Sequence, residues 1–371
     1  MVLIKTRRDA LLAPLQTVSG IVERRHALPI LSNVLLEKTN EVLTLMATDI
    51  EIQITTATVA DGDGSGAVTV GARKLQDILR SLPDGAEVSL VLEDKRLQIK
   101  SGKSRFNLQT LPAADFPSMT VSEGQITSLS LAQNKFRRLL TQTLYAMAAQ
   151  DVRYYLNGLL LIIDGTELRA VATDGHRLAY ASTEITEPST ENAGRQELIV
   201  PRKTVIELNR LLTDSDDPLV IELLSNQVRF RFGQIIMVSK LIDGRFPDYQ
   251  RVIPDSLRHV VSFNRVSLLQ SMVRAAILTN EKFRGVRLIL GEGGLKITAA
   301  NAEQEEAQEE IEATYDGETI DVGFNVSYLL DVLNNVSDET IEWGFNDASS
   351  SALLTIPGNE RFKYVVMPMR I

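Results

Sequence analysis

The feature that most constrains the fold is a repeat of nearly the whole chain. An apolar hexapeptide occurs three times, as Leu31–Leu36, Leu156–Leu161 and, more weakly, Phe283–Leu288. Its copies are offset by 125 and then 127 residues, from position 31 to 156 and from 156 to 283. The same offsets superimpose a second motif, which occurs as Ala47–Asp49, Ala172–Asp174 and Ala299–Asn301. Solenoid repeats are about 20–50 residues long, whereas a unit of this period has the size of a domain. The sequence therefore predicts three similar domains.

The composition is that of an ordinary globular protein. The chain has 371 residues, of which 44% are hydrophobic and 23% are charged. Because it contains no cysteine, disulfides, thiolate metal sites and cysteine nucleophiles are excluded. No apolar run is long enough to span a membrane, and the segment Met1–Lys5 lacks the features of a signal peptide. We expect a cytoplasmic protein without membrane contact.

Charge is unevenly distributed along the chain. The net charge is −9, yet no Lys, Arg or His occurs between Ile297 and Glu360. Segregation of this kind predicts separate positive and negative surfaces. Solvated faces that differ by chance are the alternative.

Each repeat has the same predicted order of elements. Apolar residues at helical spacing predict one helix near the start of each repeat, over 8–18, 134–147 and 265–276. A second helix is expected later in each, over 72–81, 201–212 and 326–334, with Pro201 in a first turn. Stretches of period two, such as Leu43–Met46 and Glu51–Thr55, predict strands. The fold class is α+β: three structurally similar domains of antiparallel sheet plus two helices.

The repeat junctions follow from the same pattern. They fall near Glu123–Gly124 and near Pro254–Asp255. We therefore expect domains at 1–126, 127–254 and 255–371.

Five of the six predicted helices carry or adjoin basic residues. These are Lys5, Arg7, Arg8, Arg24, Arg25, Arg73, Lys74, Arg80, Lys135, Arg137, Arg138, Arg202, Lys203, Arg210, Arg265 and Arg274. If equivalent helices face the same way, their charges add into one positive surface, and a polyanion is the natural ligand. No base-reading module is evident, so the pattern favours contact with a nucleic acid backbone without sequence preference. Ordinary solvated helix faces are the alternative.

One short segment could suggest catalysis. Asp174 and His176 could form an orienting pair for a nucleophile. However, no Gly-x-Ser-x-Gly elbow or nucleotide-binding loop is present, and a surface or structural histidine is the simpler interpretation. The other histidines, His26 and His259, have no ligand spacing. We predict no catalytic residue, no metal and no cofactor, and keep a hydrolytic or nuclease site at Asp174 and His176 as the alternative.

Two segments near the C-terminus remain open to two interpretations. The acidic run from Glu303 to Glu310 lacks the residue order of a calcium loop and is a solvated face or a charge-complementary interface. The segment Tyr364–Ile371 is apolar almost to its last residue. It is a buried strand or the lip of a binding groove, where Met367 and Met369 would suit varied partners.

Several strings along the chain resemble one protein family. They are Gln150–Gly158, Ala172–Leu178, Phe246–Tyr249, Asn280–Gly285, Gly323–Tyr328 and Val365–Arg370. Together with the threefold repeat they resemble the bacterial sliding clamps, the β subunits of DNA polymerase III. The resemblance implies a non-catalytic processivity factor. It also implies the DNA clamp fold and a head-to-tail homodimer that closes a ring of six domains around duplex DNA. A scaffold of three repeats without a nucleic acid role is the remaining alternative.

The resemblance also implies partners and contact residues. The implied partners are the polymerase III α subunit, the clamp loader δ subunit, and other polymerases and repair proteins that carry short clamp-binding peptides. DNA contacts are implied for Arg25, Gln150, Tyr154 and Tyr155. Helix position adds Arg73, Arg80, Lys203 and Arg210.

A ring interface between the first domain of one copy and the third of another is implied as well. Phe106 and Leu108 would pack against Ile277 and Leu278. Three basic residues would face three acidic ones, namely Lys74, Lys103 and Arg105 against Glu303, Glu305 and Glu309.

The last implied site is a groove for partner peptides. It maps onto Leu156, Thr173, Gly175, His176, Arg177, Leu178, Pro247, Arg251, Val252, Phe283, Asn325, Tyr328, Ser349, Val365, Met367, Pro368, Met369 and Arg370. In this interpretation His176 is a wall of the groove. Two positions depart from the family pattern. Ser349 replaces a small aliphatic residue, and Ile371 replaces Leu, which leaves the peptide preference open.

Overall fold

A computed structural model describes residues 2–23, 27–62, 65–120, 127–185 and 194–370. Within these ranges the chain forms 24 β-strands and six α-helices. Arg25, His26, the junction at Glu123–Gly124 and Ile371 lie outside the described residues.

The first repeat contains two groups of four antiparallel strands. One group has the order β1 (Val2–Arg7), β6 (Glu87–Glu93), β7 (Arg96–Ser101) and β8 (Ser104–Leu111). The other has the order β5 (Gly66–Gly71), β2 (Asn33–Thr39), β3 (Val42–Thr48) and β4 (Ile52–Val59). A short pairing between β5 and β8 joins the two groups.

The strands of the second repeat follow the same two orders. The first group is β9 (Thr127–Ala132), β14 (Pro218–Leu223), β15 (Gln227–Phe232) and β16 (Ile235–Lys240). The second is β13 (Gln196–Pro201), β10 (Gly158–Asp164), β11 (Glu167–Thr173) and β12 (Arg177–Glu184).

The third repeat has this topology too. Its first group is β17 (His259–Asn264), β22 (Thr340–Phe345), β23 (Ala352–Ile356) and β24 (Asn359–Val366). Its second is β21 (Ile320–Asn325), β18 (Gly285–Gly291), β19 (Gly294–Ala300) and β20 (Glu306–Ile311). The predicted α+β class with antiparallel sheets and two helices per repeat is therefore confirmed.

Sheets continue from one repeat into the next by edge pairing. The last strand of the second group in the first repeat, β4, pairs antiparallel with β16. The equivalent strand of the second repeat, β12, pairs in the same way with β24. The equivalent strand of the third repeat, β20, pairs with β19 alone among the described strands. The same kind of junction thus occurs twice, and an edge of the same type is left over at β20.

The six helices agree closely with the sequence pattern. They are α1 (Arg8–Ser19), α2 (Ala72–Ser81), α3 (Gln133–Thr141), α4 (Arg202–Leu211), α5 (Arg265–Ala276) and α6 (Val326–Asn335). Two details were wrong. The helix predicted over 134–147 ends at Thr141 and is followed by a short 3-10 turn at Leu144–Ala146. Pro201 is the last residue of β13 and lies before α4, where its fixed φ suits extended backbone.

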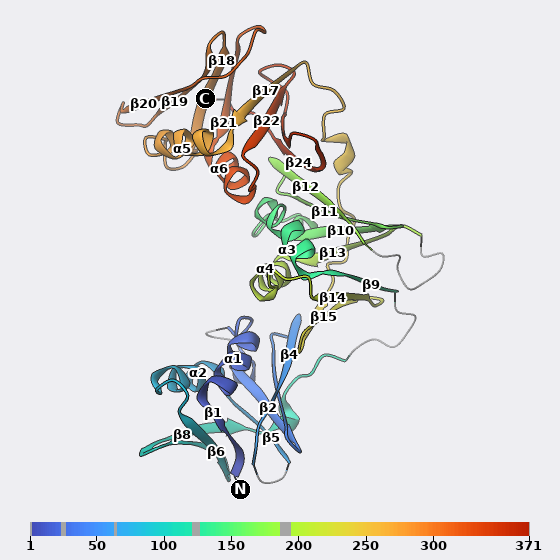
Figure 1. Cartoon of the computed structure of the whole chain (residues 1–371), viewed down its shortest axis with the longest axis vertical. Helices are drawn as coiled ribbons and strands as arrows, with labels where there is room; N and C mark the ends of the chain where they lie inside the picture. Colours follow the sequence, from blue (N-terminus) through green and yellow to red (C-terminus); the bar gives the residue numbers. More distant parts are fainter. Residues whose placement is uncertain (1, 24–26, 63–64, 121–126, 186–193, 371) are drawn as a thin grey trace. The chain divides into compact units, whose positions relative to one another are not determined.

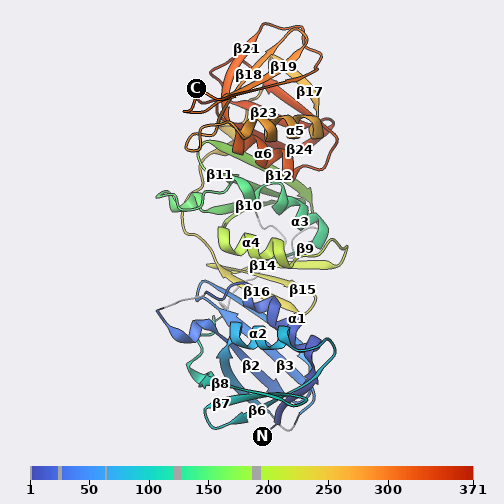
Figure 2. The same ribbon diagram turned by 90° about the vertical axis from the view of Figure 1, so that its left-hand side faces the viewer.

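Contacts divide the chain into two compact units, one formed by the described residues of 1–134 and 206–241 and the other by those of 135–185, 194–205 and 242–371. In the first unit α1 and α2 lie side by side, with α1 against β3 and β4 and α2 against β2 and β5 (Figure 1). In the second, α5 and α6 contact each other in the same manner (Figure 2). None of the helices among the described residues is long and apolar enough to cross a membrane.

Candidate functional site

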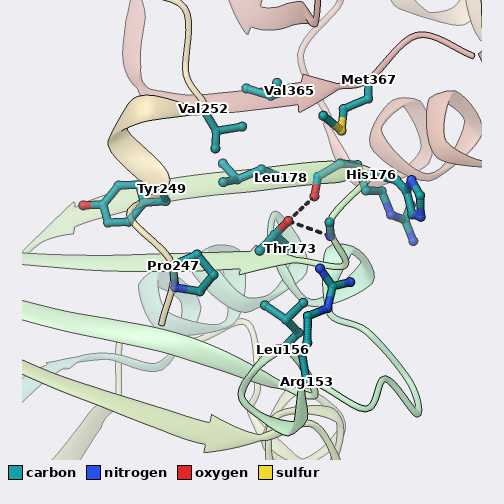
Figure 3. A pocket seen from close by; sticks show the side chains of 12 residues that line it. Arg153, Leu156, Thr173, His176, Leu178, Pro247, Tyr249, Val252, Val365 and Met367 are labelled. Atoms are coloured by element: carbon teal, nitrogen blue, oxygen red, sulfur yellow. Dashed lines mark hydrogen bonds between the residues drawn. The ribbon is translucent and has the colours of Figure 1, made fainter. Parts of the chain in front are cut away.

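A pocket in the second unit brings together distant parts of the sequence. It has a volume of about 180 Å³. Side chains come from the segment before β10, the turn between β11 and β12, the loop around Tyr249, and the end of β24 (Figure 3). The lining residues are Arg153, Leu156, Thr173, Gly175, His176, Arg177, Leu178, Pro247, Tyr249, Val252, Val365 and Met367.

The floor of the pocket is apolar and belongs to the core. Leu156, Leu178 and Val365 are buried and pack in one hydrophobic cluster. Val252 and Met367 are 41% and 46% exposed, so apolar surface remains accessible at the rim. The volume suits one or two large apolar side chains and is below the size of a typical drug-sized ligand site. Burial of one such side chain contributes about 1.5–3 kcal/mol.

The wall of the pocket is a turn fixed by hydrogen bonds. The backbone N–H groups of His176 and Arg177 donate to Asp174 Oδ1 at 2.9 and 3.1 Å. Thr173 Oγ1 donates to the carbonyl of Arg177 at 2.6 Å and accepts from the N–H of Gly175 at 3.1 Å. Gly175 has φ +89°, and a Cβ there would approach the Arg153 guanidinium to 2.9 Å. Only glycine fits this turn without displacing Arg153.

Arg177 ties the turn to α6. Its guanidinium donates to Asp174 Oδ2 at 3.1 Å, to Asp331 Oδ2 at 2.5 Å and to the carbonyl of Tyr145 at 2.6 Å. It also lies 4.5 Å from the ring centre of Tyr328. Burial opposes the Arg177 charge, but the Tyr364 hydroxyl and the Asp331 carboxylate outweigh it, so the pKa of Arg177 is raised. Arg177 is therefore a fixed part of the wall.

The geometry gives no support to a hydrolytic pair at Asp174 and His176. Among the described residues, the Asp174 carboxylate receives its hydrogen bonds from two backbone N–H groups and from Arg177. The His176 ring stacks on Tyr328, with 6.5 Å between ring centres. Asp174 thus orders the turn, and the imidazole is an exposed wall. No group of three or more metal-ligating side chains occurs among the described residues.

Ten of the eighteen residues predicted for the groove line this pocket, and the others lie elsewhere. Tyr328 contacts Arg177 of the wall, and Arg251 pairs with Asp248 at 2.9 Å. Asn325 caps α6, and Ser349 donates its hydroxyl to Asp347. The remaining four, Phe283, Pro368, Met369 and Arg370, do not line the pocket.

Two lining residues were missed by the sequence reasoning. Arg153 and Tyr249 both lie inside strings that carried the family resemblance, Gln150–Gly158 and Phe246–Tyr249. Membership of those strings was the one signal available, because neither residue stands out by spacing or hydropathy.

The residues predicted to contact DNA are mostly exposed. Arg73 and Arg80 lie on the exposed face of α2, and Gln150 and Tyr154 are exposed as well. Arg210 is less available. It pairs with the buried Glu207 and donates to the carbonyl of Thr17 at 3.0 Å. Tyr155 and Lys203 are half-buried.

The residues predicted for the ring interface lie at two edges. Phe106 and Leu108 are on β8, with Lys103 and Arg105 exposed beside them, and Lys74 is on α2. Ile277, directly after α5, is 74% exposed, whereas Leu278 is half-buried. Glu303 and Glu305 precede β20 and are exposed. Glu309 already pairs with Arg274 at 2.6 Å, and this hydrogen bond lowers the pKa of Glu309.

Fold and site together define a class of protein. Three α+β repeats with one strand topology, joined edge to edge, form the three-domain clamp fold, and the pocket around Leu178 suits an apolar peptide anchor.

Comparison with known proteins identifies the family. Sequence profiles of the DNA polymerase III beta subunit match its N-terminal domain at residues 2–120, its central domain at 130–248 and its C-terminal domain at 250–370. The beta sliding clamp of Pseudomonas aeruginosa is 48% identical over 366 residues, covering 98% of this chain and 99% of the relative. That of Escherichia coli is 47% identical over 365 residues, covering 98% of both.

Solved structures agree with the sequence match. The crystal structure of the DNA polymerase III subunit beta from Pseudomonas aeruginosa has a TM-score of 0.93 at 48% identity, covering 99% of this chain and 100% of that one. The chain belongs to the DNA polymerase III β subunit family, the bacterial sliding clamps. It accordingly acts as a non-catalytic processivity factor of the replicative polymerase.

Proposed function

We propose that two copies of this chain close head to tail into a ring around duplex DNA. The observation that carries the proposal is the repeated edge pairing. β4 and β12 occupy equivalent positions in the first and second repeats. They pair with β16 and β24, which occupy equivalent positions in the second and third repeats. By strand order, β20 in the third repeat is equivalent to β4 and β12, and β8 in the first repeat is equivalent to β16 and β24. Among the described strands, neither β20 nor β8 pairs with another repeat. Pairing of β20 with β8 of a second copy would use both, and two-fold symmetry would repeat the contact.

The charges at these two edges support the pairing. β8 carries Arg105 and is preceded by Lys103, whereas β20 carries Glu306 and Glu310 and is preceded by Glu303. Opposite charges on paired edges favour the correct partner and disfavour pairing of like edges. Phe106, Leu108 and Ile277 would supply the apolar part of the contact.

The DNA contacts follow from the basic helices. Arg73 and Arg80 on α2 are exposed. They would make transient contacts to phosphates together with Arg25, Gln150, Tyr154, Tyr155 and Lys203. Such contacts carry no sequence information and weaken with salt, which suits sliding. Arg210 would contribute mainly by fixing α4 to the end of α1. The proposed domains are 1–126, 127–254 and 255–371, and the proposed compartment is the cytoplasm.

The pocket would serve as a docking site for partner proteins. Its apolar floor and accessible rim fit a short peptide whose anchor side chain enters between Leu178 and Met367. The peptides would belong to the polymerase III α subunit, the clamp loader δ subunit, and other polymerases and repair proteins. Predicted groove residues outside the pocket would contact the flanks of the peptide.

Retention on DNA of different topology tests the ring. The protein is loaded by its clamp loader onto a nicked circular plasmid and is separated from free protein by gel filtration. We expect retention on the circle at about 0.5 M salt, where phosphate contacts alone are weak. Linearisation of the plasmid should release the protein from the DNA ends. Equal retention on circular and linear DNA would overturn the proposal.

A further inference from the structure

A second cavity also includes Tyr249 in its lining. It has a volume of about 530 Å³ and a mainly polar lining. Its lining residues are Arg169, Tyr180, Tyr249, Gln250, Ile253, Pro254, Asp255 and Lys363. Tyr249 is the one residue that it shares with the apolar pocket. The two cavities therefore adjoin at this side chain.

Tyr249, which lines this cavity, has a hydroxyl without a hydrogen-bond partner in the described part of the chain. Tyr249 is 5% exposed, and its hydroxyl is buried with no hydrogen-bond partner among the described residues. The hydroxyl points away from Leu178 and Pro247 of the apolar pocket (Figure 3). Because a buried hydroxyl without a partner is costly, a ligand atom that bonds to it would be stabilised.

The aromatic wall and the cations set the charge that the cavity accepts. Tyr180 stacks on Tyr249, with 6.1 Å between ring centres, and Lys363 Nζ lies 5.9 Å from the Tyr180 ring centre. Arg169 is already committed to Glu167 at 2.6 Å and to Asp164 at 3.5 Å.

Lys363, in contrast, forms no ion pair among the residues that the structure describes. The lining contains one carboxylate, the exposed Asp255. A cationic ligand would meet Arg169 and Lys363, whereas an anionic one gains the uncommitted Lys363. A carboxylate can also accept a hydrogen bond from the Tyr249 hydroxyl.

We propose that this cavity takes the acidic side chain of the peptide whose apolar anchor occupies the first pocket. The inference rests on the proposed peptide docking and names a specificity determinant for it. Since an extended chain advances about 3.3 Å per residue, the Asp or Glu lies within a few residues of the anchor. Lys363 supplies the charge and Tyr249 the hydrogen bond, so the site selects acidic flanks over neutral ones.

A peptide series tests the proposal. Fluorescent nonapeptides carry two adjacent leucines as the anchor and either Glu or Gln at each flanking position in turn, and binding is measured by fluorescence polarisation at about 50 mM salt. At one flanking position we expect Glu to bind about 3- to 10-fold more tightly than Gln. Raising the salt to about 0.5 M should shrink that ratio.

Two variants assign the preference to the cavity. Lys363→Gln should reduce the Glu-to-Gln ratio to within about twofold while leaving the Gln peptide unchanged. Tyr249→Phe keeps the ring and should also lower the ratio. Lys296→Gln on β19, which belongs to a different sheet, is the matched control and should keep the full preference.

The outcomes separate this proposal from the one it rests on. If the Gln peptides fail to bind the wild type at all, peptide docking in the apolar pocket fails. If they bind but no Glu position improves binding, or if Lys363→Gln retains the preference, the acidic site is overturned. A Glu peptide without leucines that competes as well as the anchored one would overturn the link between the two cavities.

Discussion

At the scale of residues, one turn explains why a short motif recurs along the chain. Asp49 accepts from the N–H groups of Glu51 and Ile52 at 3.0 and 2.8 Å, and Thr48 donates to the carbonyl of Ile52 at 2.8 Å. Asp174 makes the equivalent bonds between β11 and β12. In the third repeat, Asn301 accepts from the N–H groups of Glu303 and Glu305. The main role of the motif is therefore to hold the turn between two strands by side-chain to backbone hydrogen bonds. Its copy in the second repeat also lies beside the pocket.

The shared turn allows its two roles to be separated. Asp174→Ala removes two backbone hydrogen bonds and the bond to Arg177, and Asp49→Ala removes two backbone hydrogen bonds. We expect each substitution to lower the free energy of unfolding by about 1 kcal/mol, as measured by urea denaturation. Asp174→Ala should also weaken binding of an anchor peptide about 5- to 10-fold, because the pocket wall loses its support.

Asp49→Ala is the control for that prediction and should leave peptide affinity unchanged. Asp174→Asn should recover most of the affinity, because an amide oxygen still accepts from both N–H groups. Equal loss of affinity in the Asp49 and Asp174 variants would show that the turn has no special role at the pocket.

Arg153, the second arginine in the pocket lining, pairs with the carboxylate of Asp151. The hydrogen bond from Arg153 lowers the pKa of Asp151 to about 2. Because this value lies below the ordinary one of about 3.9, the stabilisation is present above that ordinary pKa and is lost as pH falls toward 2. Carbon-detected NMR titration of Asp151 should show a midpoint near pH 2. Arg153→Gln should move the midpoint up toward pH 4, and an unchanged midpoint would contradict the pairing.

At the scale of elements, the helices were the part of the fold most readily predicted. Apolar side chains such as Leu11, Leu15 and Val18 recur on one face of α1, and the structure buries them. The bounds of α2 and α5 agree with the pattern. The helix at α3 was predicted too long, since Leu144 and Met147 continue the apolar pattern after Thr141. The chain there forms a 3-10 turn over Leu144–Ala146 instead.

The pocket could not be assembled from the sequence pattern. Leu178, Pro247 and Val365 come together because β12 pairs with β24, a strand about 185 residues further along the chain in the next repeat. Local periodicity does not encode such a partner choice. The family resemblance supplied most of the lining, and it missed Tyr249, whose significance lies in a buried hydroxyl that sequence cannot show.

One element departs from its own propensity. Pro14 lies inside α1, where it lacks the N–H that would bond to the carbonyl of Ala10. We expect Pro14→Ala to raise the free energy of unfolding by about 1–3 kcal/mol in urea denaturation. Gln270→Pro on α5, an exposed helical position, should lower it by about 3 kcal/mol or more. A destabilising Pro14→Ala would contradict this expectation and show that α1 depends on the proline ring.

At the scale of the whole molecule, the three repeats differ where assembly requires it. Four edge strands pair with each other within the chain, β4 with β16 and β12 with β24. β8 and β20, which remain, carry the most strongly contrasting charges. The same topology thus serves two purposes, since it links repeats within one chain and offers a matched pair of edges to a second copy.

A charge exchange at these edges tests the closed ring. Lys103→Glu with Arg105→Glu places negative charge on both sides of the proposed contact, and so we expect a monomer. Glu303→Lys with Glu305→Lys reverses the other edge and should have the same effect. The chain with all four substitutions restores complementarity at both contacts and should again dimerise, as measured by sedimentation velocity at about 0.1 M salt.

The mixture of the two double variants provides the sharpest outcome. In a head-to-tail ring, one contact of the mixed dimer pairs two reversed edges and the other pairs two native edges, so both are complementary. Mixing should therefore produce a heterodimer from two monomeric proteins, and loading onto circular DNA should return with it. If the mixture stays monomeric while the fourfold variant dimerises, the two edges belong to different contacts and the head-to-tail arrangement is wrong.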